Sequence, residues 1–382
     1  MASLRLLVVS CCLLAACNAA APVYDLEKPT VIPGEYLLVL KSGSIGLATT
    51  PKGLQVLDTF NINGWRAIHV KVEDSVLAAL TEDANVDYIQ ANAREIRVDC
   101  TPQDTGSRLW GLSRTSSRAL PDFSTAQYFV DDNDGNGVNV YILDTGIRIT
   151  HNDFGGRASY GFVAPGLVGE GPGDLHGHGT HCAGTAGGTE FGVAKACNII
   201  EVKVMSRFGS GSTTDIVAGI NYVTDQHNSG SAKKSVINLS LGSSGSNSAM
   251  ESAVQASINA GVHNAIAAGN SNADACNFTP ARVGDALTVG STTNTDTMSS
   301  FSNWGTCVDL IAPGSSILSA SHTSDTGTAT MSGTSMAAPH VAGWVARELS
   351  RWPDAGAPAP IPMKQVLQDA ATTGAVNPPN NT

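Results

Sequence analysis

An acid, an imidazole and a hydroxyl lie at three points of the chain where strands are predicted to end or helices to begin. Asp144 follows an apolar run and precedes Thr-Gly, so its carboxylate would emerge at the carboxyl end of a strand, where open α/β sheets place ligands. His178 lies in His-Gly-His-Gly-Thr-His-Cys-Ala-Gly (176–184), whose glycines allow close backbone approach. Ser335, in Gly-Thr-Ser-Met-Ala-Ala-Pro-His (333–340), opens a helical segment at the positive end of its dipole. Nucleophilic acyl transfer needs these three residue types, because a serine hydroxyl attacks well only when a base removes its proton.

Runs rich in Val, Ile and Leu alternate with helical segments around these residues. The runs suit strands that are buried on both faces, and they are Val138–Leu143, Ile199–Val204, Val236–Leu239, Val262–Ala267 and Leu287–Val289. Helices are predicted at Ile216–Val223, behind the capping-box-like Ser212-Thr-Thr-Asp215, at Met250–Ala260 before Gly261, and after Ser335, where Val341, Val345 and Leu349 recur. Strand and helix in alternation predict an α/β fold with a mostly parallel sheet.

A smaller unit precedes this part, between Val31 and Val98. Its apolar patterns predict strands at Glu35–Leu40, Trp65–Val72 and Val86–Gln90, and a helix at Glu73–Asp83. This unit is of the α+β type and pairs no nucleophile with a base.

Two other stretches carry weaker signals of order. Asp99–Ser117 contains Pro102, Gly106 and Gly111 and is predicted to be a linker, the kind of segment that processing proteases cut. The tail Pro353–Thr382 is rich in Pro, Ala and Asn. We expect it to be poorly ordered, apart from a short helix around Met363–Ala370.

Composition excludes several classes of protein. Charged residues make up 14% of the 382 residues and hydrophobic residues 42%, which is too apolar for a disordered chain. The 22 basic and 33 acidic residues give a net charge of −11, and no basic cluster is longer than Lys233-Lys234. Binding to a nucleic-acid backbone is therefore not expected.

The start of the chain has the features of an export signal. The hydrophobic run Leu4–Ala16 has Arg5 near its start and is followed by Ala19-Ala20-Ala21. This order is typical of a cleaved secretory signal, here residues 1–21, and the run is too short to span a bilayer. A competing reading is a lipoprotein signal with Cys17 lipidated, based on Leu14-Ala-Ala-Cys17.

Removing the signal leaves an odd number of cysteines. They are Cys100, Cys182, Cys197, Cys276 and Cys307. In an oxidising compartment this set allows at most two disulfides and leaves at least one free thiol.

The three segments around Asp144, His178 and Ser335 resemble the active-site blocks of subtilisin-like serine proteases, of the proteinase K and aqualysin branch. Further matching segments are Gly192–Lys195, Asn238–Gly242, Ala267–Asp274, Phe301–Asn303 and Ala312–Gly314. The resemblance covers Trp110–Ala346 and implies a subtilisin-like three-layer α/β fold with a mostly parallel sheet. The zone from Val31 to Val98 is similar to the family's propeptide, a chaperone and inhibitor that self-cleavage removes.

The resemblance assigns a role to each matching residue. Ser335 would attack the scissile carbonyl, His178 would take its proton, and Asp144 would hold the imidazole. Asn270 matches the family's side-chain donor to the oxyanion, together with the backbone N–H of Ser335.

The substrate would lie as an extended strand between two segments, as in β-augmentation. They are Gly209, Ser210 and Gly211 on one side and Ser240, Leu241 and Gly242 on the other. The primary pocket would be walled by Ser240–Gly242 and by Ala267, Ala268 and Gly269. Because these segments contain no acidic residue, we expect large apolar residues before the cut bond rather than Arg or Lys.

Other features carried by the resemblance are structural. Cys276 and Cys307 match a bridged pair, and Cys182 matches a free cysteine. A calcium site is implied at Asp309 with the carbonyls of Gly284 and Ala286, although Gly284 stands where the relative has a proline. Cys100 and Cys197 have no assigned partner.

Two groups of residues resemble metal sites, and for each of them a simpler interpretation is favoured. His178 could join Asp174, His176, His181 and Cys182 as ligands, but the family pattern reserves it for catalysis. Asp132–Gly137 resembles half of a calcium loop, yet Leu143 stands where a bidentate Glu is needed, so we expect a polar surface turn.

We therefore expect a secreted, extracellular serine endopeptidase made as a self-processing zymogen. Its parts would be a signal peptide (1–21), an inhibitor-like propeptide (22–102, cut between Val98 and Gln103) and a catalytic domain with a Pro-rich tail (103–382). It would act as a monomer on proteins or peptides, with its propeptide as inhibitor, no cofactor for catalysis, and no membrane or nucleic-acid partner in the mature form.

Two other functions are compatible with parts of the sequence. The first is a family member that cuts itself once, stays bound to its prodomain and acts as a binding protein. The second is an esterase of the α/β-hydrolase class, which is disfavoured because Gly333-Thr-Ser-Met-Ala337 lacks the second glycine of the nucleophile elbow and the order of the three residues differs.

Overall fold

A computed structural model describes residues 20–24, 26, 31–62, 64–93, 101–131, 133–230, 234–352 and 356–376. The chain divides into two compact units, Met1–Val98 and Asp99–Thr382, which are described in turn. The hydrophobic run of the expected signal and Cys100 lie outside the described residues.

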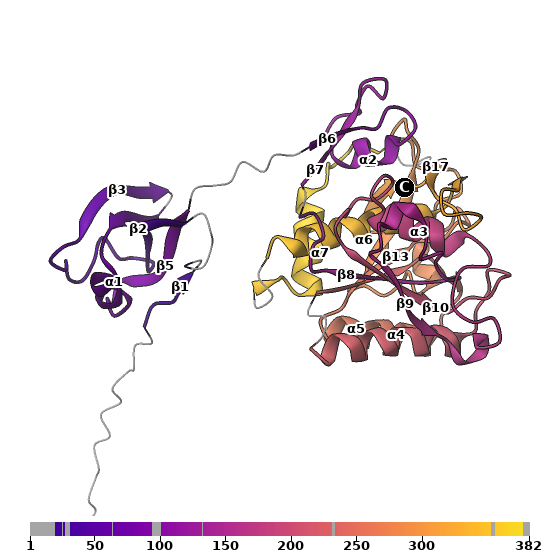
Figure 1. Ribbon diagram of the computed structural model, residues 1–382, viewed down its shortest axis with the longest axis horizontal. Helices are drawn as coiled ribbons and strands as arrows, with labels where there is room; N and C mark the ends of the chain where they lie inside the picture. The colour runs from indigo at the N-terminus through magenta and orange to yellow at the C-terminus, as the bar shows by residue number, and fades with distance from the viewer. Residues whose placement is uncertain are drawn as a thin grey trace, which may run out of the picture. The chain divides into compact units, whose positions relative to one another are not determined.

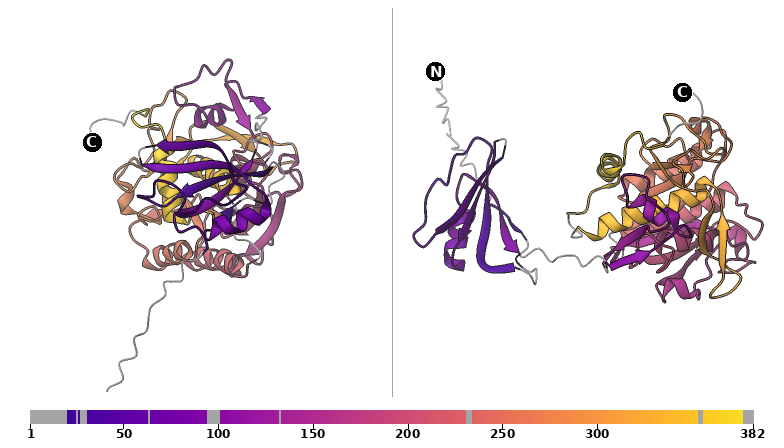
Figure 2. Two further views of the ribbon diagram at one scale, coloured as in Figure 1. Left: turned by 90° about the vertical axis from the view of Figure 1, so that its left-hand side faces the viewer. Right: turned by 90° about the horizontal axis from the view of Figure 1, so that it is seen from above.

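In its described residues the first unit has a five-stranded sheet and one helix, and Figure 2 shows its strands side by side. Its elements are β1 (Val23–Tyr24), β2 (Val31–Leu40), β3 (Gln55–Ile62), β4 (Trp65–Lys71), α1 (Asp74–Thr81) and β5 (Val86–Ala93), in the sheet order β1-β5-β2-β4-β3. Leu38, Val70, Leu80 and Ile89 are fully buried in its core. Strand β3 was not predicted, because its apolar residues Val56, Leu57, Phe60 and Ile62 do not alternate strictly along the strand; all eight of its residues are exposed.

The second unit is built on a seven-stranded sheet in which every neighbouring pair is parallel. Its strands are β8 (Asn139–Asp144), β9 (Ala158–Val163), β10 (Asn198–Lys203), β11 (Ser235–Leu239), β13 (His263–Ala267), β15 (Leu287–Thr292) and β16 (Leu310–Pro313), in the order β16-β15-β13-β11-β8-β10-β9. The five apolar runs of the sequence correspond to β8, β10, β11, β13 and β15. The predicted α/β class with a mostly parallel sheet is confirmed.

Helices cover both faces of this sheet (Figure 1). Helices α3 (His178–Gly187) and α6 (Thr334–Ser350) lie on one face, and α4 (Thr213–Asn228) and α5 (Ser248–Asn259) lie on the other. Successive residues of a strand point to opposite faces, so Val140 and Ile142 of β8 join one core while Tyr141 and Leu143 join the other. This double burial explains why the strands read as continuous apolar runs.

Shorter elements complete the second unit. They are β6 (Thr101–Asp104) paired with β7 (Gln127–Val130), α2 (Trp110–Thr115), β12 (Ser243–Ser244) paired with β14 (Phe278–Thr279), β17 (Ile317–Ala320) paired with β18 (Thr328–Met331), and the 3-10 turns Asn152–Phe154, Pro165–Leu167 and Ala275–Asn277. The predicted linker at Asp99–Ser117 is therefore wrong where the structure describes it. Trp110 and Leu112 are buried in the main core and fold this stretch onto the unit.

The C-terminal region is also better ordered than its composition predicts. Helix α7 (Pro360–Ala370) buries Met363 and Leu367 in the same core as α6. These side chains lie four residues apart on one helix face, which is why the helix packs despite its Pro-rich surroundings. None of the helices in the part of the chain that the structure describes is long and apolar enough to cross a membrane.

Two further details bear on the sequence predictions. Cys276 and Cys307 form a disulfide, the pairing that the resemblance implies. Of the expected surface turn at Asp132–Gly137, the structure describes residues 133–137; this part is only partly exposed, because Asp134 is buried and pairs with Arg347 at 2.9 Å.

Candidate active site

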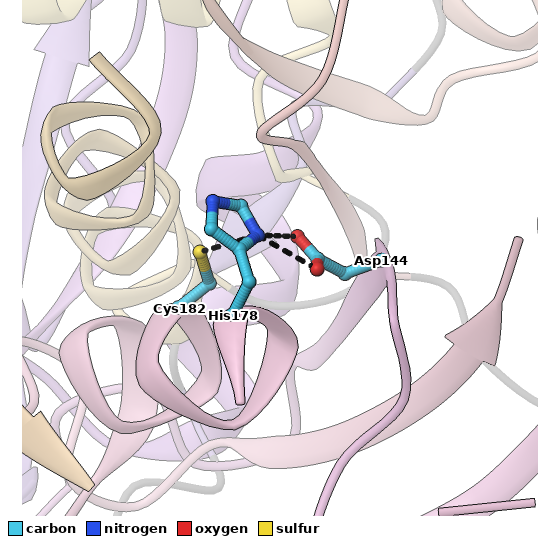
Figure 3. Close-up of side chains that lie close together, drawn as sticks. All are labelled: Asp144, His178 and Cys182. Carbon is cyan, nitrogen blue, oxygen red and sulfur yellow. Dashed lines mark hydrogen bonds and ion pairs between the residues drawn. The ribbon is translucent and has the colours of Figure 1, made fainter. Parts of the chain in front are cut away.

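Asp144 and His178 meet at the carboxyl end of β8 (Figure 3). Both carboxylate oxygens of Asp144 lie close to Nδ1 of His178, at 2.8 and 2.9 Å. Because an ionised carboxylate only accepts hydrogen bonds, Nδ1 carries the proton in the neutral imidazole and Nε2 is left as the basic nitrogen. Figure 3 shows this second nitrogen on the side of the ring away from Asp144.

Helix α3, which begins at His178, starts in close contact with the loop after Asp144. A Cβ at Gly179 would lie 2.1 Å from the carbonyl oxygen of Gly146, so a side chain there would push the helix away. The hydroxyl of Thr145 accepts from the backbone N–H of Gly179 at 3.0 Å. These contacts fix the imidazole beside its carboxylate.

Asp174 holds the start of the same helix. Its Oδ1 accepts from the backbone N–H groups of His176 and Gly177 at 2.9 and 2.8 Å, and its Oδ2 accepts from the N–H and hydroxyl of Thr180 at 2.9 and 2.6 Å. Burial raises the pKa of Asp174, but hydrogen bonds from Thr180, Gly177 and His176 outweigh it and the pKa lies below its ordinary value. The sequence indicates Asp174 only as a candidate metal ligand. An Asp shortly before a helix start is the signal that could have indicated this capping role.

The pKa of His178 is set by two opposing effects. Burial lowers it, but the charge of Asp144 and the neighbouring Cys182 raise it by more, so the pKa lies well above the ordinary 6.5. The neutral, basic form of the imidazole is therefore reached at a higher pH than in an ordinary histidine.

Ser335 is the second residue of α6, and Cys182 lies between it and the histidine. The thiol of Cys182 donates to the carbonyl oxygen of Ser335 at 3.3 Å and is 4.0 Å from Nδ1 of His178. The Ser335 hydroxyl donates to the carbonyl oxygen of Ser240 at 3.2 Å. The amino-terminal parts of α3 and α6 are therefore in contact, as expected if His178 and Ser335 share one site.

Asn270 is oriented so that its amide nitrogen is the available group. Its Oδ1 accepts from the backbone N–H of Thr334 at 2.8 Å and from the Thr334 hydroxyl at 3.0 Å. A Cβ built on Gly333 would lie 3.5 Å from Nδ2 of Asn270 and 3.6 Å from the backbone nitrogen of Ser335. The N–H of Ser335 is among the first four of α6, which have no acceptor inside the helix. Two donors thus border the same small space, an arrangement that can bind an oxyanion.

Asn303 holds the loop that carries Asn270. Its Nδ2 donates to the carbonyl oxygen of Ala268 at 2.8 Å, and its Oδ1 accepts from the N–H groups of Ser271 and Ala273 at 2.9 and 3.1 Å. The sequence placed Asn303 in a matching segment but did not indicate this positioning contact.

The expected substrate segments lie at or after the carboxyl ends of β10, β11 and β13. Strands β10 and β11 flank β8 in the sheet, and β13 lies on the far side of β11. The residues are Gly209, Ser210 and Gly211, then Ser240, Leu241 and Gly242, then Ala267, Ala268 and Gly269. The first three are exposed, as is Gly242, whereas Ser240, Ala267 and Ala268 are buried. The carboxyl ends of neighbouring parallel strands share one edge of a sheet, so the segments gather around Asp144.

The alternative metal ligands are engaged in other contacts. His181 Nε2 bonds the carbonyl oxygen of Ile317 at 2.9 Å, and burial lowers the pKa of His181 to about 4. Asp144, His178 and Cys182 do place ligand atoms within 4.8 Å of one another. However, burial raises the pKa of Cys182, and a metal would need the thiolate. These three groups fit hydrogen bonding to one another better than a metal centre.

The expected calcium position is filled by a side chain of the protein. Gly284 O, Ala286 O and Asp309 Oδ1 do come together, but Nζ of Lys364 lies 2.6, 2.9 and 2.6 Å from them. The sequence-based calcium site therefore does not fit this structure, because an ammonium group holds the centre of the ligand set. The lysine was missed because it lies on α7, far along the chain from Asp309.

The two remaining cysteines in the described ranges, Cys182 and Cys197, are buried free thiols. Burial raises the pKa of Cys197 to about 12. Neither is a candidate nucleophile, since reactive cysteines have lowered pKa values.

Comparison with known proteins places this geometry in a family. Residues 135–382 match the family model described as the subtilase family. An extracellular serine proteinase from Thermus sp. is 42% identical over 92% of this chain and 90% of that protein. Subtilisin-like protease 4 from Trichophyton equinum is 39% identical over 93% of this chain and 91% of that protein.

Solved structures agree. A cold adapted subtilisin-like serine proteinase is similar with a TM-score of 0.63 and 45% identity, covering 70% of this chain and 93% of that one. A protease from Pseudoalteromonas arctica is similar with a TM-score of 0.56 and 28% identity, covering 64% and 86%. The chain belongs to the subtilase family and is a serine-type endopeptidase.

Proposed function

We propose that the chain hydrolyses protein substrates with Ser335 as nucleophile, His178 as general base and Asp144 as the group that orients the imidazole. The observation that carries this proposal is the contact of both Asp144 oxygens with Nδ1 of His178, at 2.8 and 2.9 Å. This contact leaves Nε2 of His178 as the proton acceptor. His178 lies on α3, and Cys182 of the same helix contacts Ser335.

In the proposed mechanism, the Ser335 hydroxyl turns from Ser240 O toward Nε2 of His178. Its oxygen bonds to the scissile carbonyl carbon as its proton passes to Nε2, and the Asp144 carboxylate stabilises the imidazolium. The carbonyl oxygen takes the negative charge and accepts from Asn270 Nδ2 and the Ser335 N–H. The C–N bond then breaks as the amine takes the proton from His178. Water repeats the sequence on the acyl-enzyme and frees Ser335.

We further propose that the substrate lies as an extended strand between 209–211 and 240–242. Main-chain hydrogen bonds would supply affinity, and the pocket walled by 240–242 and 267–269 would select the residue before the cut. An apolar preference is supported by the lack of acidic residues in these segments. Peptides with Leu or Phe before the cut should be cleaved faster than matched Arg peptides, and the reverse order in a fluorogenic assay would contradict this preference.

We also propose that the enzyme is secreted as a zymogen, with a signal peptide at 1–21, a propeptide at 22–102 and a catalytic domain at 103–382. The named extracellular relative, which aligns over 92% of this chain, supports this arrangement. A serine-directed covalent inhibitor tests the nucleophile: it should add one label, on the peptide containing Ser335, in the wild type but not in Ser335→Ala. Labelling elsewhere, or labelling of both proteins, would contradict the assignment.

A further inference from the structure

Helix α7 carries one lysine whose ammonium is held by the two loops ahead of β15 and β16. Nζ of Lys364 lies 2.6 Å from Gly284 O, 2.9 Å from Ala286 O and 2.6 Å from Asp309 Oδ1. The side chains of Lys364 and Asp309 are only 15% and 12% exposed. This cluster is partly shielded from water, unlike an ordinary surface ion pair.

The hydrogen-bonding capacity of the ammonium is matched by its surroundings. A lysine has three N–H donors and no acceptor, and three oxygens surround it here. The other carboxylate oxygen of Asp309 accepts from the backbone N–H of Thr288 at 2.9 Å. Both charged groups therefore have hydrogen-bond partners besides each other, as a stable shielded pair requires.

The same oxygens cannot hold a calcium ion while Lys364 is in place. Calcium takes six to eight oxygens at about 2.3–2.6 Å. An ion bound to Gly284 O, Ala286 O and Asp309 Oδ1 would have to occupy the position of Nζ. The site therefore contains a cation already, as part of the chain.

The position of the cluster indicates what it stabilises. Lys364 lies next to Met363, which is fully buried in the main core, and Leu367 follows one turn later. Ala286 and Asp309 immediately precede β15 and β16, which are adjacent in the sheet. The lysine thus ties α7 to the amino ends of two strands, at the opposite end of the strands from the edge that carries Asp144.

We propose that the Lys364 ammonium replaces a structural divalent cation in this protein and holds α7 against the catalytic unit. The three oxygens around it form a latent calcium site that becomes usable when the side chain is shortened. This inference concerns stability and does not depend on proteolytic activity.

The test uses the full-length chain with Ser335→Ala, which prevents self-digestion whether or not the proposed mechanism holds. Thermal unfolding is followed with EGTA and with calcium chloride for this parent and for Lys364→Ala, a change that suits a helix. In EGTA, Lys364→Ala should lower the Tm by about 5–10 °C. Calcium should restore at least half of that loss, beyond any effect it has on the parent.

Two further variants make the result specific. Adding Asp309→Asn to Lys364→Ala removes the carboxylate, so the calcium gain should disappear. Arg351→Ala removes an exposed pair with Glu348 and should shift the Tm by less than about 2 °C with no new calcium response. If Lys364→Ala does not fold, Lys364→Met keeps the apolar part of the side chain, and the same comparison is made with it.

The proposal is overturned if Lys364→Ala and its parent have the same Tm in EGTA, because the lysine would then contribute nothing to stability. It is also overturned if calcium affects the lysine variant no more than the parent, or if the calcium gain survives Asp309→Asn.

Discussion

Glu201 is a buried acid whose protonation we expect to control stability. It lies in β10 with a fully buried side chain. Its Oε2 accepts from the backbone N–H groups of Ile147 at 2.6 Å and Gly173 at 3.1 Å. These belong to the loops that follow Asp144 and precede Asp174, so the acid supports the framework of the active site.

Burial raises the pKa of Glu201 from 4.5 to about 7, although the N–H groups and Lys203 lower it in part. Between these values the folded chain holds a proton that the unfolded chain has released. The stability that this proton provides is present below pH 4.5 and is lost as the pH rises through 7. At about 1.36 kcal/mol for each pKa unit, the full loss is about 3 kcal/mol, of which about 2.5 kcal/mol falls between pH 5 and 8.

Glu201→Gln imitates the protonated acid, because the amide keeps an oxygen acceptor for both N–H groups and carries no charge. In a Ser335→Ala background, the free energy of unfolding is measured with urea for the Gln variant and for its parent. The difference, variant minus parent, should rise by about 2 to 3 kcal/mol between pH 5 and pH 8. The control is Glu190→Gln, an exposed acid paired with Arg108, which should show no such trend.

A free-energy gap between Glu201→Gln and its parent that stays constant from pH 5 to 8 would refute this reasoning. So would a gap that favours the parent at pH 8. Either result would mean that Lys203 and the N–H groups keep the folded carboxylate ionised.

Two further predictions concern catalysis. Asn270→Ala should lower kcat by about 10² to 10³-fold with little change in KM, the range established for this donor in a subtilisin. Asn272→Ala, on the same loop, is the control and should lower kcat far less. Equal losses of kcat in the two variants would contradict a specific oxyanion role for Asn270. The second concerns pH: kcat/KM should rise with pH through a pKa above 6.5, because the Asp144 charge overcomes the effect of burial on His178. Asp144→Asn should move that acid limb to lower pH, and a wild-type rate that is flat from pH 5 to 8 would count against His178 as the base.

Much of the catalytic unit could be predicted because its signals are local. The strands around Asp144 are buried on both faces and read as apolar runs. The three site segments fall at strand ends and helix starts, which the sequence marks with glycines and cap residues. Helix α4 begins as predicted, with the Ser212 hydroxyl accepting from the N–H of Asp215 at 3.1 Å.

The features that were missed depend on contacts between distant segments. Strand β3 is wholly exposed, and its apolar residues do not follow the strict alternation of a half-buried strand. Helix α2 lies in a turn-rich stretch, and its order comes from Trp110 entering a core assembled elsewhere. Lys364 reaches Asp309 only after α7 has packed, so no local pattern could distinguish an ammonium from a calcium ion at that position.

The central claim is that Ser335 is the nucleophile of a self-processing protease. The most direct test compares the intact mass and N-terminal sequence of purified wild type and Ser335→Ala, then measures casein hydrolysis with and without a serine-directed inhibitor. We expect wild type to begin between Val98 and Gln103 and to digest casein in an inhibitor-sensitive way, while Ser335→Ala keeps its propeptide and is inactive. A Ser335→Ala protein that is processed and digests casein like wild type would contradict the account. A wild type that cleaves itself once, retains its prodomain and leaves casein intact would instead indicate a binding protein.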